Sequence, residues 1–175
     1  MSRTTLKQIV EAILFASDEP VSVERLAEAA GEGTTPADVR RAVEELVADY
    51  DATGRAFTVE EIAGGLQLFT RPEFNPYLRK VLAQQRRQRF TQAALETLAV
   101  VAYKQPVGRA EIEDIRGVAC GDILRTLMEK GLVRVVGRSE GPGRALLYGT
   151  TKKFLQAFGL ASLKDLPDAK SLVEP

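Results

Sequence analysis

AYKQPVGRAEIEDIRGV, residues 102–118, is the stretch that decides the fold of this chain. Proline is not tolerated in a helix interior and restricts the residue before it, so Pro106 ends the preceding apolar helix near residues 103–105. Val107 is then extended, and Gly108 begins the next helix. The stretch therefore predicts a helix, a short extended piece and a second helix.

The second helix of this stretch carries Ile112 and Ile115 at helical spacing, and we expect both side chains to face a core. Gly117 ends it, because glycine readily adopts the left-handed conformation that closes helices. A third helix follows, with Ile123 and Leu124 among its apolar residues. This order is typical of the opening of a winged helix-turn-helix domain.

The first half of the chain repeats this plan. Pro20-Val21 precedes Pro106-Val107 by about 86 residues, and Leu26 lies at the same offset from its proline as Ile112. In each half, alternating residues then predict two strands joined by a turn, 57–62 with 66–70 and 132–136 with 145–148. The repetition predicts a mostly α fold with small β-hairpins (α+β), built as two tandem winged helix-turn-helix domains.

The boundaries follow from composition. We expect an N-terminal domain over 1–83, a polar linker over 84–90, a C-terminal domain over 91–167 and a flexible tail over 168–175. The N-terminal domain ends in a helix over 72–82, whose apolar side carries Tyr77, Leu78, Val81 and Leu82. After the second hairpin, Thr151 and Ser162 are positioned to cap two short helical segments.

Net charge is zero, from 24 basic and 24 acidic residues, but the halves differ. Residues 1–83 carry 9 Lys and Arg against 14 Asp and Glu, and residues 84–175 carry 15 against 10. A dedicated duplex-binding protein is usually more basic than this, because neutralised phosphates supply much of its affinity. No apolar run approaches the roughly 20 residues that span a bilayer, so we expect no membrane contact.

The residues offer little for catalysis. Histidine is absent, and the single cysteine, Cys120, has no base to activate it, so we interpret it as a buried or half-buried thiol. Glu111, Glu113 and Asp114 lie along one turn and are typical of a solvated face near a helix N-terminus. We therefore predict no enzyme activity, catalytic residue, metal or cofactor. One cysteine also fits a reducing cytoplasm.

Duplex DNA binding is the alternative function, because winged helices often place their third helix in the major groove. In the first half that helix carries Arg40 and Arg41, but four carboxylates share it, at Asp38, Glu44, Glu45 and Asp49. The turn residues Arg138 and Arg144 can contact phosphates or pair with acids. This alternative describes a transcriptional regulator.

Apolar residues exceed what two small domains need. A dense run lies near the end of the second domain, at Phe154, Leu155, Phe158, Leu160, Leu163 and Leu166. The first helix is strongly amphipathic. Both features suggest that some apolar surface is presented to another chain.

Several separated motifs resemble the bacterial segregation and condensation protein B family, from about Leu6 to Pro167. The motifs are residues 102–118, 137–138, 142–144, 148–151, 154–155, 158–160 and 163–167, with 9–16, 20–21 and 64–68 in the first half. Gly108 departs from the pattern because it stands where a hydroxyl residue caps the helix. Ala145 stands where proline is frequent.

The resemblance implies two winged-helix domains, a homodimer formed mainly through the first domain, and binding to the kleisin, segregation and condensation protein A. The kleisin in turn bridges the heads of the SMC ATPase (structural maintenance of chromosomes). It implies a non-catalytic accessory subunit of chromosome condensation and segregation, cytoplasmic and associated with the nucleoid, whose contact with nucleic acid is weak or indirect.

Two sets of contact residues follow as hypotheses. We expect the kleisin-facing surface to include Tyr103, Lys104, Gln105, Arg109, Arg116, Arg138 and Arg144. We expect the dimer interface to include Leu6, Ile9, Val10 and Ile13 on the first helix.

Overall fold

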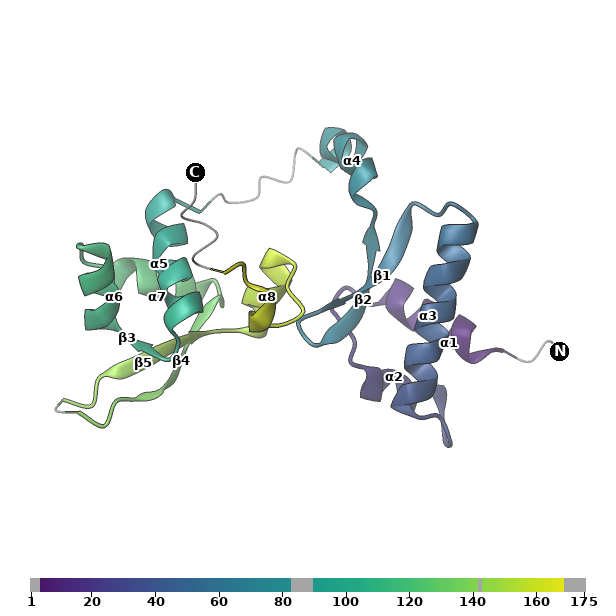
Figure 1. Ribbon diagram of the computed structural model, residues 1–175, viewed down its shortest axis with the longest axis horizontal. Helices are drawn as coiled ribbons and strands as arrows, with labels where there is room; N and C mark the ends of the chain where they lie inside the picture. Colours follow the sequence, from purple (N-terminus) through teal and green to yellow (C-terminus); the bar gives the residue numbers. More distant parts are fainter. Residues whose placement is uncertain (1–3, 83–89, 142, 169–175) are drawn as a thin grey trace. The chain divides into compact units, whose positions relative to one another are not determined.

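The computed structural model describes residues 4–82, 90–141 and 143–168. The chain divides into two compact units, residues 1–86 and 87–175, and Figure 1 shows the elements of each. The predicted linker and tail lie outside the described residues, except Phe90 and Asp168. Phe90, the last residue of the predicted linker, packs against the core of the second unit.

The first unit contains three helices, a β-hairpin and a further helix. Its elements are α1 (Leu6–Ala16), α2 (Val23–Ala30), α3 (Pro36–Ala52), β1 (Phe57–Ile62), β2 (Gly65–Thr70), a 3-10 turn (Pro72–Phe74) and α4 (Asn75–Leu82). β1 and β2 pair antiparallel around the turn at residues 63–64. Val21 adds one bridge to Leu66.

The second unit repeats the order of helices and hairpin. Its elements are α5 (Gln92–Lys104), β3 (Val107–Gly108), α6 (Arg109–Arg116), α7 (Gly121–Glu129), β4 (Val133–Arg138), β5 (Leu146–Thr150), α8 (Lys152–Phe158) and a 3-10 turn (Leu163–Asp165). The three strands pair antiparallel in the order β3-β5-β4. The predicted mostly α fold with small β-hairpins is confirmed, and a winged helix-turn-helix remains our interpretation of each unit.

Side-chain caps place the helix starts. Side-chain oxygens accept hydrogen bonds from backbone N–H groups within the first turn at the predicted caps Thr151 and Ser162, and also at Ser22, Thr35 and Thr91. Satisfying these otherwise unpaired donors stabilises a helix by about 1 kcal/mol. Gly108 precedes α6 without any side-chain cap, as its missing hydroxyl requires. Gly117 closes α6 in the left-handed conformation, as predicted.

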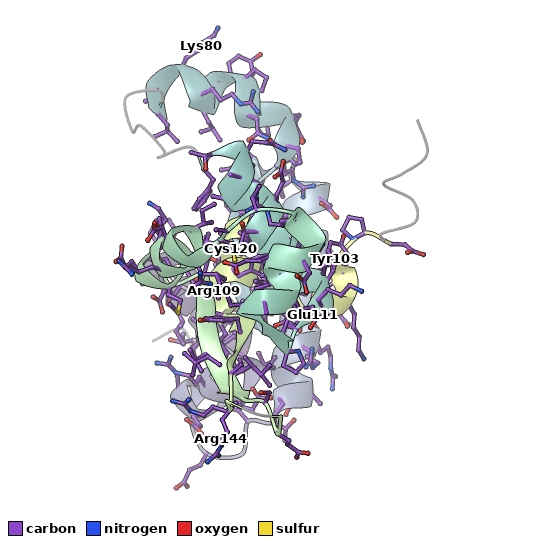
Figure 2. The ribbon with its side chains drawn as sticks, turned by 90° about the vertical axis from the view of Figure 1, so that its left-hand side faces the viewer. Lys80, Tyr103, Arg109, Glu111, Cys120 and Arg144 are labelled. Carbon is purple, nitrogen blue, oxygen red and sulfur yellow. The ribbon has the colours of Figure 1, made fainter. Side chains whose placement is uncertain are left out.

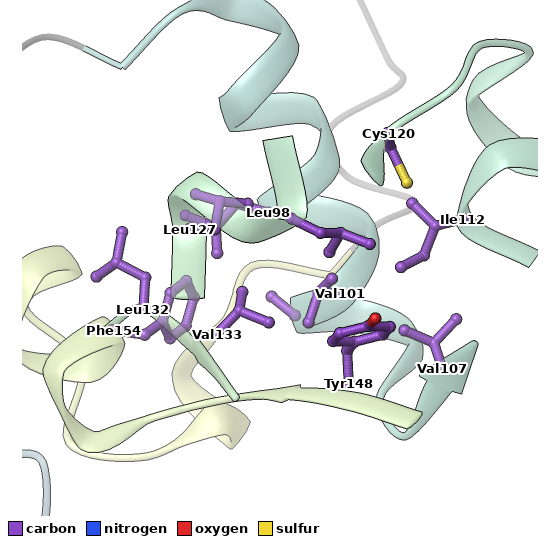
Figure 3. Packing of buried hydrophobic residues seen from close by; sticks show 12 residues of the cluster. Leu98, Val101, Val107, Ile112, Cys120, Leu127, Leu132, Val133, Tyr148 and Phe154 are labelled. Atoms are coloured by element: carbon purple, nitrogen blue, oxygen red, sulfur yellow. The ribbon is translucent and has the colours of Figure 1, made fainter. Parts of the chain in front are cut away.

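Each unit has its own core. In the first, α1, α2 and α3 bury Val10, Leu26 and Val39 completely against the hairpin. In the second, Val101, Val107, Ile112 and Leu127 are fully buried, and Figure 3 shows them packed with Tyr148 and Phe154.

Two apolar predictions are wrong in part. Ile115 is 50% exposed, because α6 turns only Ile112 toward α5 before it ends at Arg116. On α4, Tyr77, Val81 and Leu82 are 65%, 79% and 51% exposed, so the predicted apolar side is not covered by the described residues.

Gln105 joins the end of α5 to β5. Its amide Nε2 donates to the carbonyl of Ala102 at 3.0 Å, and its Oε1 accepts from the backbone N–H of Thr150 at 2.8 Å. The neighbouring Gly149 leaves space for this amide. A Cβ there would lie 2.8 Å from Cγ1 of Val136 and 2.9 Å from Oε1 of Gln105.

We predict that Gly149→Ala lowers the free energy of unfolding of the second unit by about 1–3 kcal/mol, since the added methyl group overpacks this junction. The control is Gly137→Ala on the adjacent strand, where an added Cβ meets nothing within 4 Å. Urea denaturation of the full chain, read from amide NMR signals of the second unit, measures both. Equal stability of the two variants would contradict the prediction.

Candidate partner-binding surfaces

The residues predicted to face a partner are placed very differently by the structure. Gln105, Tyr103 and Arg116 join separate segments of their own unit, Gln105 through the bonds described above. The Tyr103 hydroxyl donates to the carbonyl of Pro167 at 2.7 Å, which fastens the last described segment to α5. Tyr103 is nevertheless 39% exposed, so its ring edge remains available to a partner.

Arg116 connects α6 to α5. Its Nη2 donates to Oε2 of Glu96 at 3.0 Å, and its side chain is only 6% exposed. This hydrogen bond lowers the pKa of the Glu96 carboxyl. Within the described part of the chain, Nε and Nη1 of Arg116 are buried without a hydrogen-bond partner. The Arg116 guanidinium therefore joins α6 to α5 inside the unit, and a partner does not reach it in this conformation.

Arg109 lies at the start of α6 on an open surface. Its Nε donates to Oε1 of Glu113 at 2.8 Å, and the same oxygen accepts from the backbone N–H of Cys120 at 2.9 Å. Figure 2 shows Arg109 beside Cys120 and Arg144 at the far end of the hairpin. Glu113 thereby connects α6 to the start of α7.

An open groove of about 410 Å³ lies between α6 and β5. Its lining residues are Arg109, Ala110, Glu113, Ala145, Leu146 and Tyr148. Cys120 is 1% exposed, and burial raises the pKa of its thiol, as does the charge of Glu113. Cys120 is therefore a buried thiol, as one of the two predicted possibilities had it.

The hairpin between β4 and β5 carries the remaining predicted arginines. Nη1 of Arg138 donates to the backbone carbonyl of Arg144 at 3.3 Å, and Arg144 has a positive φ of 44°. Neither guanidinium forms an ion pair with another described residue. Lys104 at the end of α5 is likewise exposed. These cations are free to meet a partner's acids.

The predicted dimer residues on α1 also divide. Val10 is completely buried in its own core, so it does not reach a second chain. Leu6, Ile9 and Ile13 are half-buried. Phe15, which the sequence reasoning missed, is 83% exposed on the same helix. The signal in the sequence was an aromatic residue lying off the apolar stripe of the helix.

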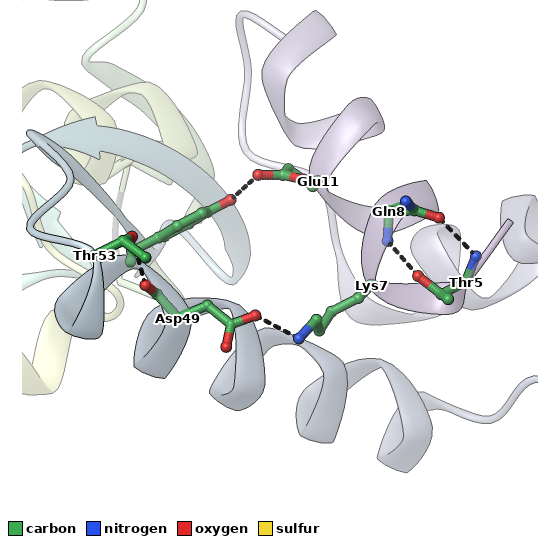
Figure 4. Close-up of polar contacts among 7 residues, drawn as sticks. Thr5, Lys7, Gln8, Glu11, Asp49 and Thr53 are labelled. Carbon is green, nitrogen blue, oxygen red and sulfur yellow. Dashed lines mark hydrogen bonds and ion pairs between the residues drawn. The ribbon is translucent and has the colours of Figure 1, made fainter.

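Polar contacts hold α1 against α3. Lys7 pairs with Asp49, and the Tyr50 hydroxyl donates to Oε1 of Glu11 at 2.8 Å (Figure 4). Burial raises the pKa of the Tyr50 hydroxyl, and its hydrogen bond to Glu11 raises it further. Because Lys7 and Glu11 face α3, the opposite side of α1 is the side that another molecule can contact.

A metal-binding group and a membrane-spanning helix are both absent from the described residues. They contain no group of three or more His, Cys, Asp or Glu side chains arranged to hold a metal ion. They also contain no helix long and apolar enough to cross a membrane.

The geometry gives a chain of two helical units with exposed basic and apolar surfaces, and comparison with known proteins gives its relatives. The family model described as "Segregation and condensation complex subunit ScpB" matches residues 8–169. The chain belongs to this family.

One curated relative and two solved structures are similar to different shares of the chain. Segregation and condensation protein B of Syntrophotalea carbinolica is 48% identical over 99% of this chain and 87% of its own. The crystal structure of ScpB from Mycobacterium tuberculosis is 35% identical over 89% of this chain and 95% of its own, with a TM-score of 0.42. A structure described as a dimer of the ScpB N-terminal domain complexed with ScpA peptide is 35% identical over 42% of this chain and 84% of its own, with a TM-score of 0.39.

The Glu113 contacts predict a pH dependence. The N–H of Cys120 and, after it, the Arg109 guanidinium lower the pKa of the Glu113 carboxyl from 4.5. A lowered pKa in the folded state means that the contribution to stability is complete above the unfolded value and is lost as pH falls through the folded value. We therefore expect Glu113→Gln, which keeps an acceptor but removes the charge, to flatten the loss of stability below about pH 5.

The measurement is urea denaturation of the full chain between pH 3 and pH 7, read from the second unit. Glu111→Gln, an exposed carboxyl on the same helix, is the control and should retain the wild-type slope. Parallel curves for wild type and Glu113→Gln would refute the assignment.

Proposed function

We propose that this protein is a non-catalytic accessory subunit of the SMC–kleisin complex, which binds the kleisin and acts in chromosome condensation and segregation. Membership of the ScpB family, matched over residues 8–169, is the observation that carries this proposal. The family description, a complex subunit, agrees with surfaces rich in unpaired cations and exposed apolar side chains. We further propose a cytoplasmic protein associated with the nucleoid through this complex.

For the kleisin-facing surface we propose the exposed cations of the second unit. Arg109, Arg138, Arg144 and Lys104 all reach solvent, and both hairpin arginines lack an acidic partner among the described residues. Tyr103 contributes its exposed ring edge. Gln105 and Arg116 support this surface from inside the unit, because their hydrogen bonds fix the ends of α5 and α6.

We predict that charge reversal at Arg109, Arg138 and Arg144 weakens kleisin binding at least tenfold, because it places acids where the partner's acids bind. Mixing the full chain with kleisin and measuring affinity by calorimetry tests this. Arg40, Arg41 and Arg125, also exposed, give a control with the same change of charge. Wild-type affinity in the first variant would refute the surface.

The same proteins separate this function from the alternative of a duplex-reading regulator. A regulator binds duplex DNA at physiological salt with a steep dependence on salt concentration. We expect the wild-type chain alone to show no such binding in a gel-shift series, and tight binding without kleisin would favour the alternative.

We also propose that the chain forms a homodimer through the first unit, with the outer side of α1 in the interface. Ile9 is half-buried on α1 and Phe15 is 83% exposed on another side of the same helix, whereas Leu6 and Ile13 also pack against the core of their own unit. Covering such a side chain contributes about 1.5–3 kcal/mol.

We predict that Ile9→Glu together with Phe15→Glu converts the full chain from dimer to monomer, because two charges would be buried without partners. Sedimentation velocity measures the oligomeric state. Leu163→Glu, at a 41% exposed apolar residue of the second unit, is the control and should leave the dimer intact. A dimeric double variant would place the interface elsewhere.

A further inference from the structure

The strand β4 is an edge strand, with β5 on one side and no strand among the described residues on the other. Its pairing register fixes which backbone groups point outward. Ser139 donates its N–H to the carbonyl of Ala145, so alternate residues of β5, namely 145, 147 and 149, turn their polar groups toward β4. Thr150 turns its N–H the other way, to Gln105.

Val135 is opposite Tyr148 and Arg138 is opposite Leu146, both positions that do not exchange hydrogen bonds in this register. The N–H and C=O groups of Val135 and Arg138 therefore point away from β5. No backbone hydrogen bond to another described segment occupies them. An edge of this kind is a template for an added strand.

The side chains along this edge have a definite chemistry. Val135 and Val136 of β4 are 42% and 43% exposed, which is high for aliphatic residues. Arg134 and Arg138 flank the valines on β4, and Arg144 lies in the turn beyond, which also carries the exposed acid Glu140. None of the three arginines forms an ion pair with a described residue, unlike Arg109 and Arg116. The edge thus offers outward-pointing backbone groups, two exposed valines and two arginines that form no ion pair with a described residue.

We infer that a short, extended, acidic segment of the kleisin adds as a strand to the outer edge of β4, with its carboxylates on the two arginines and aliphatic side chains on the valines. This inference rests on the proposed function and adds the mode of binding. Peptides that extend a sheet in this way gain affinity from the backbone and specificity from side chains.

Other occupants fit less well. A second copy pairing through the same edge would bring Arg134 and Arg138 of both protomers together, and like charges on paired strands are destabilising. Nucleic acid phosphates would use the arginines but neither the valines nor the outward carbonyls. The register shift between Val135 and Gly137 is a bulge, which limits edge pairing and requires the added strand to be short.

Two measurements on the full chain test the inference. The first is amide hydrogen exchange of residues 133–138 with and without kleisin, where we expect the outward amides of Val135 and Arg138 to exchange at least tenfold more slowly in the complex. The second is kleisin affinity of Arg134→Glu with Arg138→Glu, which we expect to fall at least tenfold. Arg125→Glu with Lys152→Glu, two exposed residues of the same unit, should bind within twofold of wild type.

The outcomes are distinct. If kleisin binds while exchange at Val135 is unchanged, the added strand is refuted and the proposed function stands. If Arg134→Glu with Arg138→Glu weakens binding to a duplex oligonucleotide but leaves kleisin affinity unchanged, the edge contacts phosphates and the inference is overturned. If the wild-type chain does not bind kleisin, both the inference and the proposed function fail.

Discussion

In each unit the helices are joined to the hairpin by backbone pairing of one extended residue that follows a proline. In the first unit, Val21 and Leu66 exchange two hydrogen bonds of 2.9 and 2.8 Å. In the second, Val107 pairs with Tyr148 on the return strand. Because a buried backbone group without a partner is costly, this pairing fixes the return strand against the helices and sets its register. The core residues on that strand follow from it.

At this junction two segments of the chain approach so closely that only glycine, which has no Cβ, fits between them. A Cβ on Gly65 would lie 3.0 Å from backbone and side-chain atoms of Pro20 and Val21. In the second unit the crowded glycine is Gly149, beside Val136 and the Gln105 amide. The two units therefore solve the same packing problem on the same strand with different neighbours. The difference is Gln105, whose side chain supplies hydrogen bonds that the first unit lacks at Glu19.

The order of elements could be predicted because prolines, caps and glycines act locally. Pro106, Thr91 and Gly117 each determine one helix boundary whatever surrounds them. Ile115 could not be assigned correctly, because burial depends on which turn of α6 meets α5 and not on helical spacing alone. For the same reason α4 shows an apolar side in the sequence without a surface that covers it among the described residues.

The partner-contact residues stay predictions, because a specific residue can serve a partner or its own unit. Tyr103, Gln105 and Arg116 were among the residues expected to face the kleisin. The structure instead gives them bonds to Pro167, Thr150 and Glu96. The sequence does not show which residues bond within their own unit and which arginines have no acidic partner there. The structure shows this, because it gives the hydrogen-bond and ion-pair partners.

That separation also bears on the charge of the chain. The second half is positive by five, and its two arginines near α6, Arg109 and Arg116, are neutralised by Glu113 and Glu96. Three of those five charges are Arg86, Arg87 and Arg89, which lie outside the described residues. Arg134, Arg138 and Arg144 on the hairpin form no ion pair with a described residue, and Glu140 is the one acid that the hairpin sequence carries beside them. Keeping like charges together costs folding energy through their mutual repulsion. The arginines beside the exposed valines of this hairpin do not stabilise the unit itself. Binding of a partner of opposite charge explains their presence better.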